Sequence, residues 1–233
     1  MPVDPNADAY YVNMDILSSP EFEFENYEGF MPFYRFGCSA KYSDVKYAPK
    51  SAIQMDRRKT YNDIMAVSGA FVVSDRFRAI IEDTEPGVHD FFPIEMKKKD
   101  GSPLGKNYYL VSIRQYCICI LPQLSACSKV KRTSFSNQPY QTCSERKLVL
   151  SRPAIKDMQI FITSVIAGGY LIVSQAVGRR LIEEKIKRLD LYPVTLSDEV
   201  WDFDTHAPEA AEWYRENPEE WENQQARNVP QPL

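Results

Sequence analysis

The sequence predicts an α+β fold of short mixed strands and a few helices, built around two strand–helix–strand pseudo-repeats. Segments 69–96 and 169–196 match without a gap, and each joins an apolar β-branched run to a pattern of helical period. Further short runs rich in aromatic and β-branched residues are typical of strands. Apolar residues make up 44% and charged residues 26% of the chain, which excludes collagen-like, disulfide-scaffold and wholly disordered classes.

Several strands are predicted outside the repeats. Residues 21–25 alternate Glu and Phe with a period of two, as in a half-buried strand. Residues 38–62 are polar and basic and are predicted as loop or short pieces. Residues 107–121 predict one long strand or two, ending before Pro122.

The second half continues in the same way. Residues 123–144 are rich in Ser, Gln and Thr and are predicted as a long loop, whereas 147–150 and 159–162 are strand candidates. We expect one unit over residues 1–197, followed by a C-terminal extension over 198–233. The last ten or so residues of this extension are too polar to bury much surface and are predicted to be disordered.

The two repeats share the same order of features. A glycine turn precedes a buried strand, a serine at the N-cap position begins a helix, and a short aromatic strand closes with proline. The identical pairs are Gly69/Gly169, Val73/Val173, Ser74/Ser174, Asp90/Asp190 and Pro93/Pro193. A duplicated unit and the chance recurrence of a common pattern both explain the match. A phosphate site at the helix N-termini would need a glycine-rich loop before each serine, which the sequence lacks.

Charge is distributed unevenly along the chain, although the net charge is only -4. Residues 1–30 hold seven acids and no Lys or Arg, and residues 198–222 hold ten acids and Arg215 as their one base. Residues 31–197 carry 15 acids and 26 bases. The chain is therefore a basic middle between two acidic ends.

The sequence indicates a cytoplasmic protein without a cofactor or metal. No apolar stretch approaches the roughly 20 residues that span a bilayer, and residues 1–11 lack the features of a signal peptide. Five cysteines without a CxxC pair, together with two histidines, give little basis for a zinc site and fit a reducing compartment. Cys117 and Cys119 are either a redox or soft-metal pair or two small apolar core residues.

Several short motifs resemble a bacterial family named immunity protein 11. They are Val73-Ser74-Asp75-Arg76-Phe77-Arg78, Phe91-Phe92-Pro93, Asn107-Tyr108-Tyr109-Leu110, Ile172-Val173-Ser174 and Tyr10-Tyr11-Val12. The resemblance covers roughly residues 10–196. It departs from the family at Gln175, where an acid is usual, and at Leu121-Pro122-Gln123-Leu124, where an Asp-containing turn is common. These departures weaken an inference about shared surface contacts more than one about the fold.

The resemblance implies an immunity protein of a polymorphic or contact-dependent toxin system. Such a protein is made together with a toxin and neutralises it by occlusion, with no chemistry of its own. Toxin partners vary within the family, so the resemblance does not identify the toxin, and the oligomeric state stays open.

The C-terminal extension is the candidate toxin-binding segment. Its acids are interleaved with all three tryptophans of the chain, and aromatic residues ringed by charge are typical of binding hot spots. The candidates are Glu199, Trp201, Asp202, Asp204, Glu209, Glu212, Trp213, Glu216, Glu220 and Trp221. The extension could instead pack its tryptophans on its own domain and leave its acids in water, or be disordered until the partner orders it.

Two other function classes remain as alternatives. In a hydrolase, Asp202 and Asp204 would act near His206, or His89 would act beside Asp90. Exposed acids, however, lack the desolvation that tunes a pKa, and the sequence has no Walker A, GxSxG, HExxH or GxGxxG motif.

A nucleic-acid-binding or regulatory interaction domain would use the basic middle of the chain. Its basic clusters are Arg57-Arg58-Lys59, Lys97-Lys98-Lys99 and Lys129 with Lys131-Arg132. Ordinary solvated loops would look the same, no recognised nucleic-acid motif is present, and the acidic ends would repel phosphates.

Overall fold

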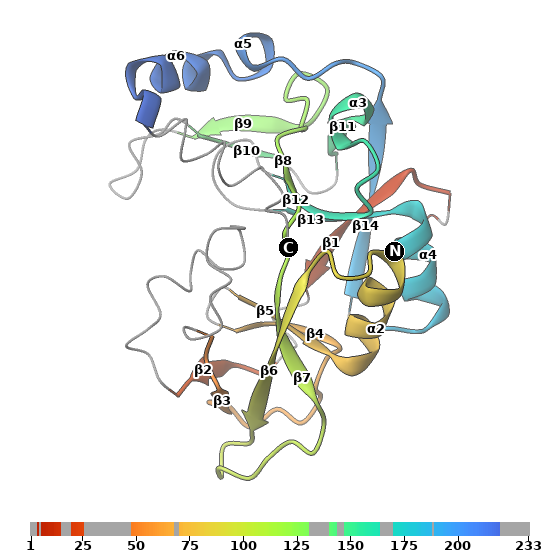
Figure 1. The fold of residues 1–233 in the computed structure, drawn as a ribbon, viewed down its shortest axis with the longest axis vertical. Helices are drawn as coiled ribbons and strands as arrows, with labels where there is room; N and C mark the ends of the chain where they lie inside the picture. Colours follow the sequence, from red (N-terminus) through yellow and green to blue (C-terminus); the bar gives the residue numbers. More distant parts are fainter. Residues whose placement is uncertain are drawn as a thin grey trace. The chain divides into compact units, whose positions relative to one another are not determined.

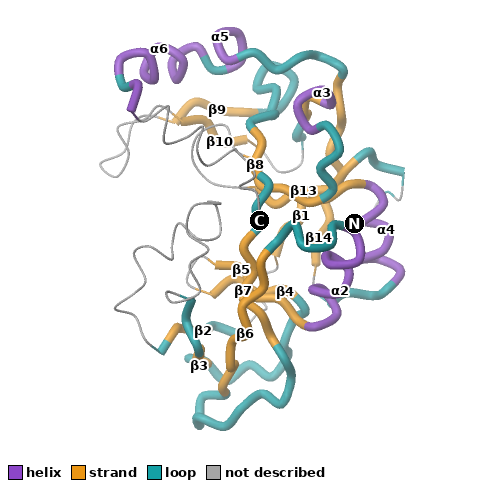
Figure 2. The backbone as a smooth tube through the Cα atoms, in the orientation of Figure 1, coloured by secondary structure: helices purple, strands orange, loops and turns teal. Residues whose placement is uncertain are grey.

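The computed structural model describes most of the chain. The described residues are 4, 6–14, 20–25, 48–67, 70–130, 140–143, 147–163, 170–187 and 189–219. Runs of several strands are separated by a few short helices, which confirms the α+β class (Figures 1 and 2). The chain divides into two compact units. Unit 1 comprises Met1–Val12, Gln115–Gly178 and Leu191–Leu233, and unit 2 comprises Asn13–Arg114 and Arg179–Asp190.

Unit 2 is built on a six-stranded sheet of order β2-β3-β6-β7-β5-β4. Its strands are β2 (Phe22–Phe24), β3 (Ser51–Gln54), β4 (Ile64–Val67), β5 (Ala70–Ser74), β6 (Asp90–Lys97) and β7 (Tyr108–Ser112). β3 and β6 pair in parallel, and the other neighbours pair antiparallel. Helix α2 (Asp75–Thr84) follows β5 and buries Phe77, Ile80 and Ile81, so its apolar face is the one that the helical period predicts.

Unit 1 contains a second six-stranded sheet, of order β11-β14-β1-β13-β12-β8, and a separate β9–β10 hairpin. Its strands are β1 (Ala9–Met14), β8 (Tyr116–Cys117), β9 (Cys127–Val130), β10 (Tyr140–Cys143), β11 (Val149–Ser151), β12 (Ile160–Thr163), β13 (Tyr170–Ser174) and β14 (Leu189–Ser197). Its helices are α3 (Arg152–Ile155), α5 (Phe203–His206), α6 (Pro208–Glu216) and the start of α4 (Gln175–Glu183).

The predicted pseudo-repeats are confirmed as strand–helix–strand units, β5-α2-β6 and β13-α4-β14. The likeness extends beyond them, because the order β3-β6-β7-β5-β4 in unit 2 corresponds to β11-β14-β1-β13-β12 in unit 1. The first two strands pair in parallel and the last two antiparallel in both orders. Val73 lies opposite Tyr109, and its counterpart Val173 lies opposite Tyr10. The shared topology favours the duplication of one unit over the chance recurrence of a common pattern. The predicted pair Gly69 and Gly169 lies outside the described residues.

One predicted loop is partly wrong. Residues 123–144 include strands β9 and β10, which pair antiparallel with Cys127 opposite Cys143. Their sequences, CSKV and YQTC, lack the alternation of apolar and polar residues by which a half-buried strand is predicted. The 107–121 segment forms two strands, and both later strand candidates are confirmed as β11 and β12. Residues 223–233 lie outside the described part of the chain.

The described cysteines differ in state. Cys117 and Cys119 are buried free thiols, and burial raises the pKa of Cys119 well above its ordinary value. A thiol held protonated in this way is a poor nucleophile and a poor metal ligand. This supports the interpretation of Cys117 and Cys119 as small apolar core residues. Cys127 is disulfide-bonded, a state that is rare in the reducing compartment expected from the sequence.

Candidate partner-binding surface of the C-terminal extension

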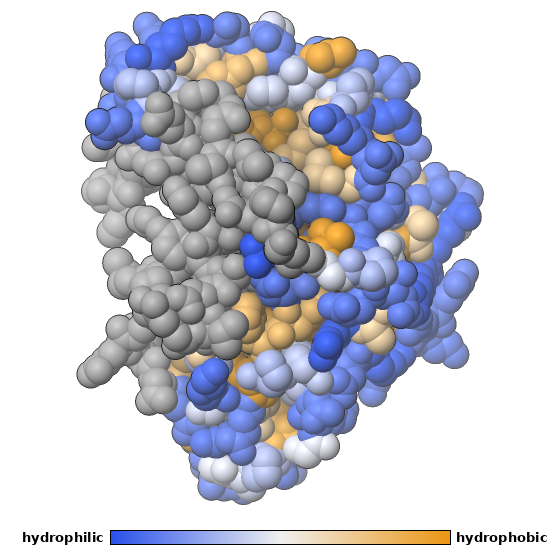
Figure 3. Space-filling view, viewed as in Figure 1, coloured by the Kyte–Doolittle hydropathy of each residue, from blue (hydrophilic) through white to orange (hydrophobic). Residues whose placement is uncertain are grey.

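Helix α6 (Pro208–Glu216) carries three acids of the extension on its exposed side. It begins with Pro208 at the first turn, where the fixed φ of proline suits a helix start. Ala210, Ala211 and Tyr214 are buried on its inner side. The predicted residues Glu209, Glu212 and Glu216 are all exposed, and the visible surface along α5 and α6 is largely hydrophilic (Figure 3).

An aromatic cluster lies beneath this surface. Trp201, Phe203 and Trp213, all partly buried, pack against the buried residues Ala207, Ala210 and Tyr214. The ring centroids are 5.4 Å apart for Trp201 and Phe203, 5.7 Å for Phe203 and Tyr214, and 5.0 Å for Trp213 and Tyr214. Two of the candidate tryptophans therefore contribute to the internal packing of the extension.

Polar contacts attach this cluster to the rest of unit 1. The Trp201 indole N–H donates to the Ile120 carbonyl at 3.0 Å, and its backbone N–H donates to Ser151 Oγ at 3.2 Å. The Ser151 hydroxyl donates in turn to the Glu199 carbonyl at 2.6 Å. Sequence reasoning missed Ile120 and Ser151, since nothing in their local sequence marks them as partners of a tryptophan some 50 or 80 residues away.

The residues of the hydrolase alternative have structural partners. The Asp202 carboxylate accepts from the Thr205 backbone N–H at 2.8 Å and caps α5; hydrogen bonds from Thr205 lower its pKa. Asp204 forms an ion pair with Arg215. His206 is buried, with Nε2 2.9 Å from Glu199 Oε1 and Nδ1 2.9 Å from the Asp202 backbone N.

His89, in unit 2, has a comparable environment. It is buried, its Nε2 lies 3.0 Å from Glu85 Oε2, and its Nδ1 accepts from the Arg114 backbone N–H at 3.2 Å. Asp90, the neighbour considered with it, pairs with Arg114. Both nitrogens of each histidine ring are thus engaged, and each ring is paired with a glutamate. Among the described residues, no group of three or more His, Cys, Asp or Glu is arranged to hold a metal ion.

Part of the basic surface is used in local contacts. Arg58 pairs with Asp56 at 3.2 Å, Lys97 pairs with Glu25 at 2.7 Å, and Lys99 donates to the Met55 carbonyl at 2.6 Å. The side chains of the third basic cluster lie outside the described residues, as do the candidates Glu220 and Trp221. Two of the three basic clusters are therefore partly engaged in holding loops of unit 2.

A comparison with protein families identifies one of which this chain has the sequence pattern. The model of an immunity protein family (Imm11) matches residues 5–195, which include most of both sheets and both pseudo-repeats. No curated protein matches the chain. The match ends before Glu199, so the candidate binding residues of the extension lie beyond it. Within the described residues, no helix is long and apolar enough to cross a membrane.

Proposed function

The chain belongs to the immunity protein family (Imm11), and from this premise we propose that it binds and neutralises a cognate bacterial toxin. It does so by covering the toxin, without catalysis, in the cytoplasm of the cell that makes both proteins. The partner is a protein, and neither a membrane nor a nucleic acid takes part. The structural observation that supports the proposal is the acidic side of α6, which lies above the aromatic cluster.

The acidic side of α6 suits a basic partner surface. Complementary charge speeds encounter and fixes the register of a complex. Glu209, Glu212 and Glu216 lie on a helix whose inner side is held by packing, so little further ordering of the backbone is needed on binding. Glu199, Asp202 and Asp204, with their own contacts, frame this surface.

The tryptophans have a different role in this proposal. Trp201 and Trp213 hold α5 and α6 in place through the aromatic cluster and the bond to Ile120. The parts of their rings that remain exposed add apolar area at the edge of the acidic surface. Glu220 and Trp221, next along the chain, are proposed to extend the same contact.

The test is a charge-neutralised variant of the full chain. In E209Q/E212Q/E216Q, association with the isolated domain of the cognate toxin is expected to slow about tenfold at low ionic strength, because electrostatic steering is lost. The matched control E23Q/D157N/E183Q removes three exposed acids elsewhere and should associate nearly as fast as the wild type. Stopped-flow association rates across a salt series measure both.

Different failures have different meanings. If the glutamate variant binds like the wild type, the contact surface lies away from α6. If the wild-type chain forms no complex with the toxin domain and does not rescue cells that express it, the neutralising function itself is wrong. Tight binding of duplex nucleic acid that survives raised salt would instead favour the nucleic-acid alternative, because loose electrostatic contacts weaken steeply with salt.

The cytoplasmic location has a separate test. The disulfide at Cys127 is expected to be reduced in that compartment, where thiol buffers keep protein disulfides open. Alkylation in intact cells, followed by mass spectrometry, distinguishes the two states. A Cys127 that resists alkylation until reductant is added would place the chain in an oxidising compartment.

A further inference from the structure

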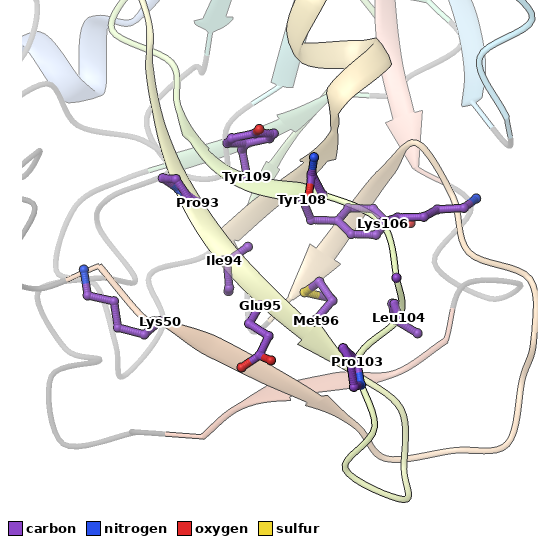
Figure 4. A pocket seen from close by; sticks show the side chains of 12 residues that line it. Lys50, Pro93, Ile94, Glu95, Met96, Pro103, Leu104, Lys106, Tyr108 and Tyr109 are labelled. Atoms are coloured by element: carbon purple, nitrogen blue, oxygen red, sulfur yellow. The ribbon is translucent and has the colours of Figure 1, made fainter.

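A hollow of about 490 Å³ opens on unit 2, beside the hairpin formed by β6 and β7. Its lining includes Lys50, Pro93, Glu95, Leu104, Lys106 and Tyr109 (Figure 4). The volume lies within the range of about 300–1,000 Å³ in which proteins bind small molecules. All its residues belong to unit 2.

The base of the hollow is apolar and firmly held. Ile94, Met96 and Tyr108 are buried beneath it. Leu104 is attached to β6 because its backbone N–H donates to the Met96 carbonyl at 2.8 Å. Pro93, exposed on β6, lies directly opposite Tyr109 on β7. An entering apolar side chain would therefore meet a preformed surface rather than one that it must order.

The sides of the hollow are positively charged. Lys50 and Lys106 are exposed, and neither forms an ion pair with any part of the chain that the structure describes. The two lysines lie on opposite sides of the labelled residues in Figure 4, with Glu95 between them. Glu95 shares Lys97 with Glu25, since Lys97 Nζ lies 3.6 Å from the Glu95 carboxylate and 2.7 Å from that of Glu25. Lys50 is fixed at its backbone, because its carbonyl accepts from the Glu95 N–H at 2.9 Å.

A cation–π stack continues the surface from Tyr109 onto α2. The Arg78 guanidinium carbon lies 4.5 Å from the centroid of the Tyr109 ring and 5.4 Å from that of Phe91. These three side chains are half-buried. Tyr, Phe and Arg are the residue types enriched in the centres of protein interfaces. Arg78 also adds a third cation at this edge of the hollow.

We propose that this hollow binds an acidic peptide segment of a partner protein. An apolar side chain of the segment packs over Pro93, Leu104 and Tyr109, and carboxylates on either side of it pair with Lys50 and Lys106. The buried apolar residues Ile94, Met96 and Tyr108 at the base of the hollow favour an apolar side chain of a peptide over a polar nucleotide. The site is independent of the acidic surface of α6 and of toxin neutralisation.

The probe is a short fluorescent peptide with a central Leu between Glu and Asp residues, added to the full chain. We expect binding at low ionic strength that K50E/K106E weakens at least about tenfold, as for the loss of two charge contacts. The matched control K147E/K187E reverses two exposed lysines away from the hollow and should bind the probe as the wild type does. E95Q, which removes the acid of the lining, should bind it more tightly.

Two further measurements separate this site from general charge attraction. Replacing the central Leu by Gly should weaken binding several-fold, and so should Y109A. A peptide with Lys in place of Glu and Asp should not bind. Equal weakening by K50E/K106E and K147E/K187E, no effect of the Leu replacement, or preferred binding of a single-stranded oligonucleotide would each overturn the proposal. Toxin binding plays no part in these readings.

Discussion

Trp201 packs within its own unit, which is one of the roles that the sequence leaves open for the tryptophans of the extension. Its ring belongs to the aromatic cluster, and its indole N–H satisfies the Ile120 carbonyl. A tryptophan beside acids in sequence is therefore an internal anchor in this fold. The same residue type at 213 lies in the cluster without any indole hydrogen bond among the described residues.

This difference predicts unequal effects of removing the indole N–H. W201F should lower the free energy of unfolding by about 0.5–1.5 kcal/mol, because it leaves the Ile120 carbonyl without that donor. W213F is the matched control and should cost less, since it keeps most of the packing and loses no such bond. Urea unfolding followed by circular dichroism measures both. A larger loss in W213F would mean that packing, rather than the hydrogen bond, makes Trp201 an anchor.

Tyr108 gives a prediction about alkaline pH. Burial, and then the charge of Asp63, raises the pKa of this phenol to about 12. Between its ordinary pKa of about 10 and about pH 12, the phenol ionises in the unfolded chain but stays protonated in the folded one. Ionisation in this pH window favours the unfolded state, so the free energy of unfolding falls as the pH rises from about 10 to about 12.

The variant Y108F isolates this effect. Near neutral pH it should cost little, because the hydrogen bond from Tyr108 to the Asn62 carbonyl is long, at 3.4 Å. Above about pH 10 it should lose stability more slowly than the wild type, because it has no phenol to ionise. Chemical unfolding at a series of pH values gives the difference. Parallel curves for the two proteins would show that Tyr108 titrates normally.

At the scale of elements, the two repeat helices share a cap but differ in its surroundings. Ser74 Oγ accepts from the Phe77 backbone N–H and Ser174 Oγ from that of Val177, each at 3.4 Å. Of these two hydroxyls, that of Ser74 also donates to a buried carboxylate, Asp63, at 2.7 Å. Asp63 also accepts from the Lys187 backbone N–H at 2.9 Å and so joins two segments of unit 2.

The loss of the two cap serines should therefore lower the free energy of unfolding by different amounts. S174A removes a long cap bond and should cost about 0.5–1 kcal/mol. S74A also removes a donor from the buried Asp63 carboxylate and should cost about 1–3 kcal/mol more. Thermal unfolding of the two variants under identical conditions provides the comparison. Equal costs would mean that Asp63 finds another donor when the hydroxyl is absent.

At the scale of the whole molecule, two related sheets carry two separate cores. The core of unit 2 includes Met65, Val72 and Leu110, whereas that of unit 1 includes Phe161 and Ile172. Met65 and Phe161 occupy corresponding places, one on β4 opposite Val72 and the other on β12 opposite Ile172. A matched pair of core variants is thus available, with one in each unit.

Hydrogen exchange on this pair tests how independent the units are. M65A and F161A should each cost about 2–5 kcal/mol through the cavity they leave. Backbone amides should exchange faster mainly in the unit that holds the substitution, because cooperative opening follows the local core. Mass spectrometry of exchanged peptides resolves the two units. Equal acceleration in both would show one cooperative unit, as the sequence predicts for residues 1–197.

Local patterns made most of the elements predictable. The β-branched run followed by serine specifies a strand and a capped helix from neighbouring residues alone, and it does so twice. Strands β9 and β10 were not predicted, because their sequences do not alternate apolar and polar residues. At the candidate site, the exposure of Glu209, Glu212 and Glu216 follows from helical period, but the contacts of Trp201 join residues distant in sequence.

By itself, the sequence determined the family, the class of fold, the two repeats and the acidic character of the extension, because each depends on residue type and short spacing. Only the tertiary structure decided which residues distant in sequence contact one another. By its helix propensity Gly178 is a poor choice for α4. A Cβ at this position, however, would lie 2.1 Å from the ring of Tyr10, so the close packing requires glycine. The hollow on unit 2 likewise exists because pairing brings Lys50, Pro93 and Tyr109 together from three strands or strand ends. Such contacts depend on register and packing between distant segments, which local sequence does not encode.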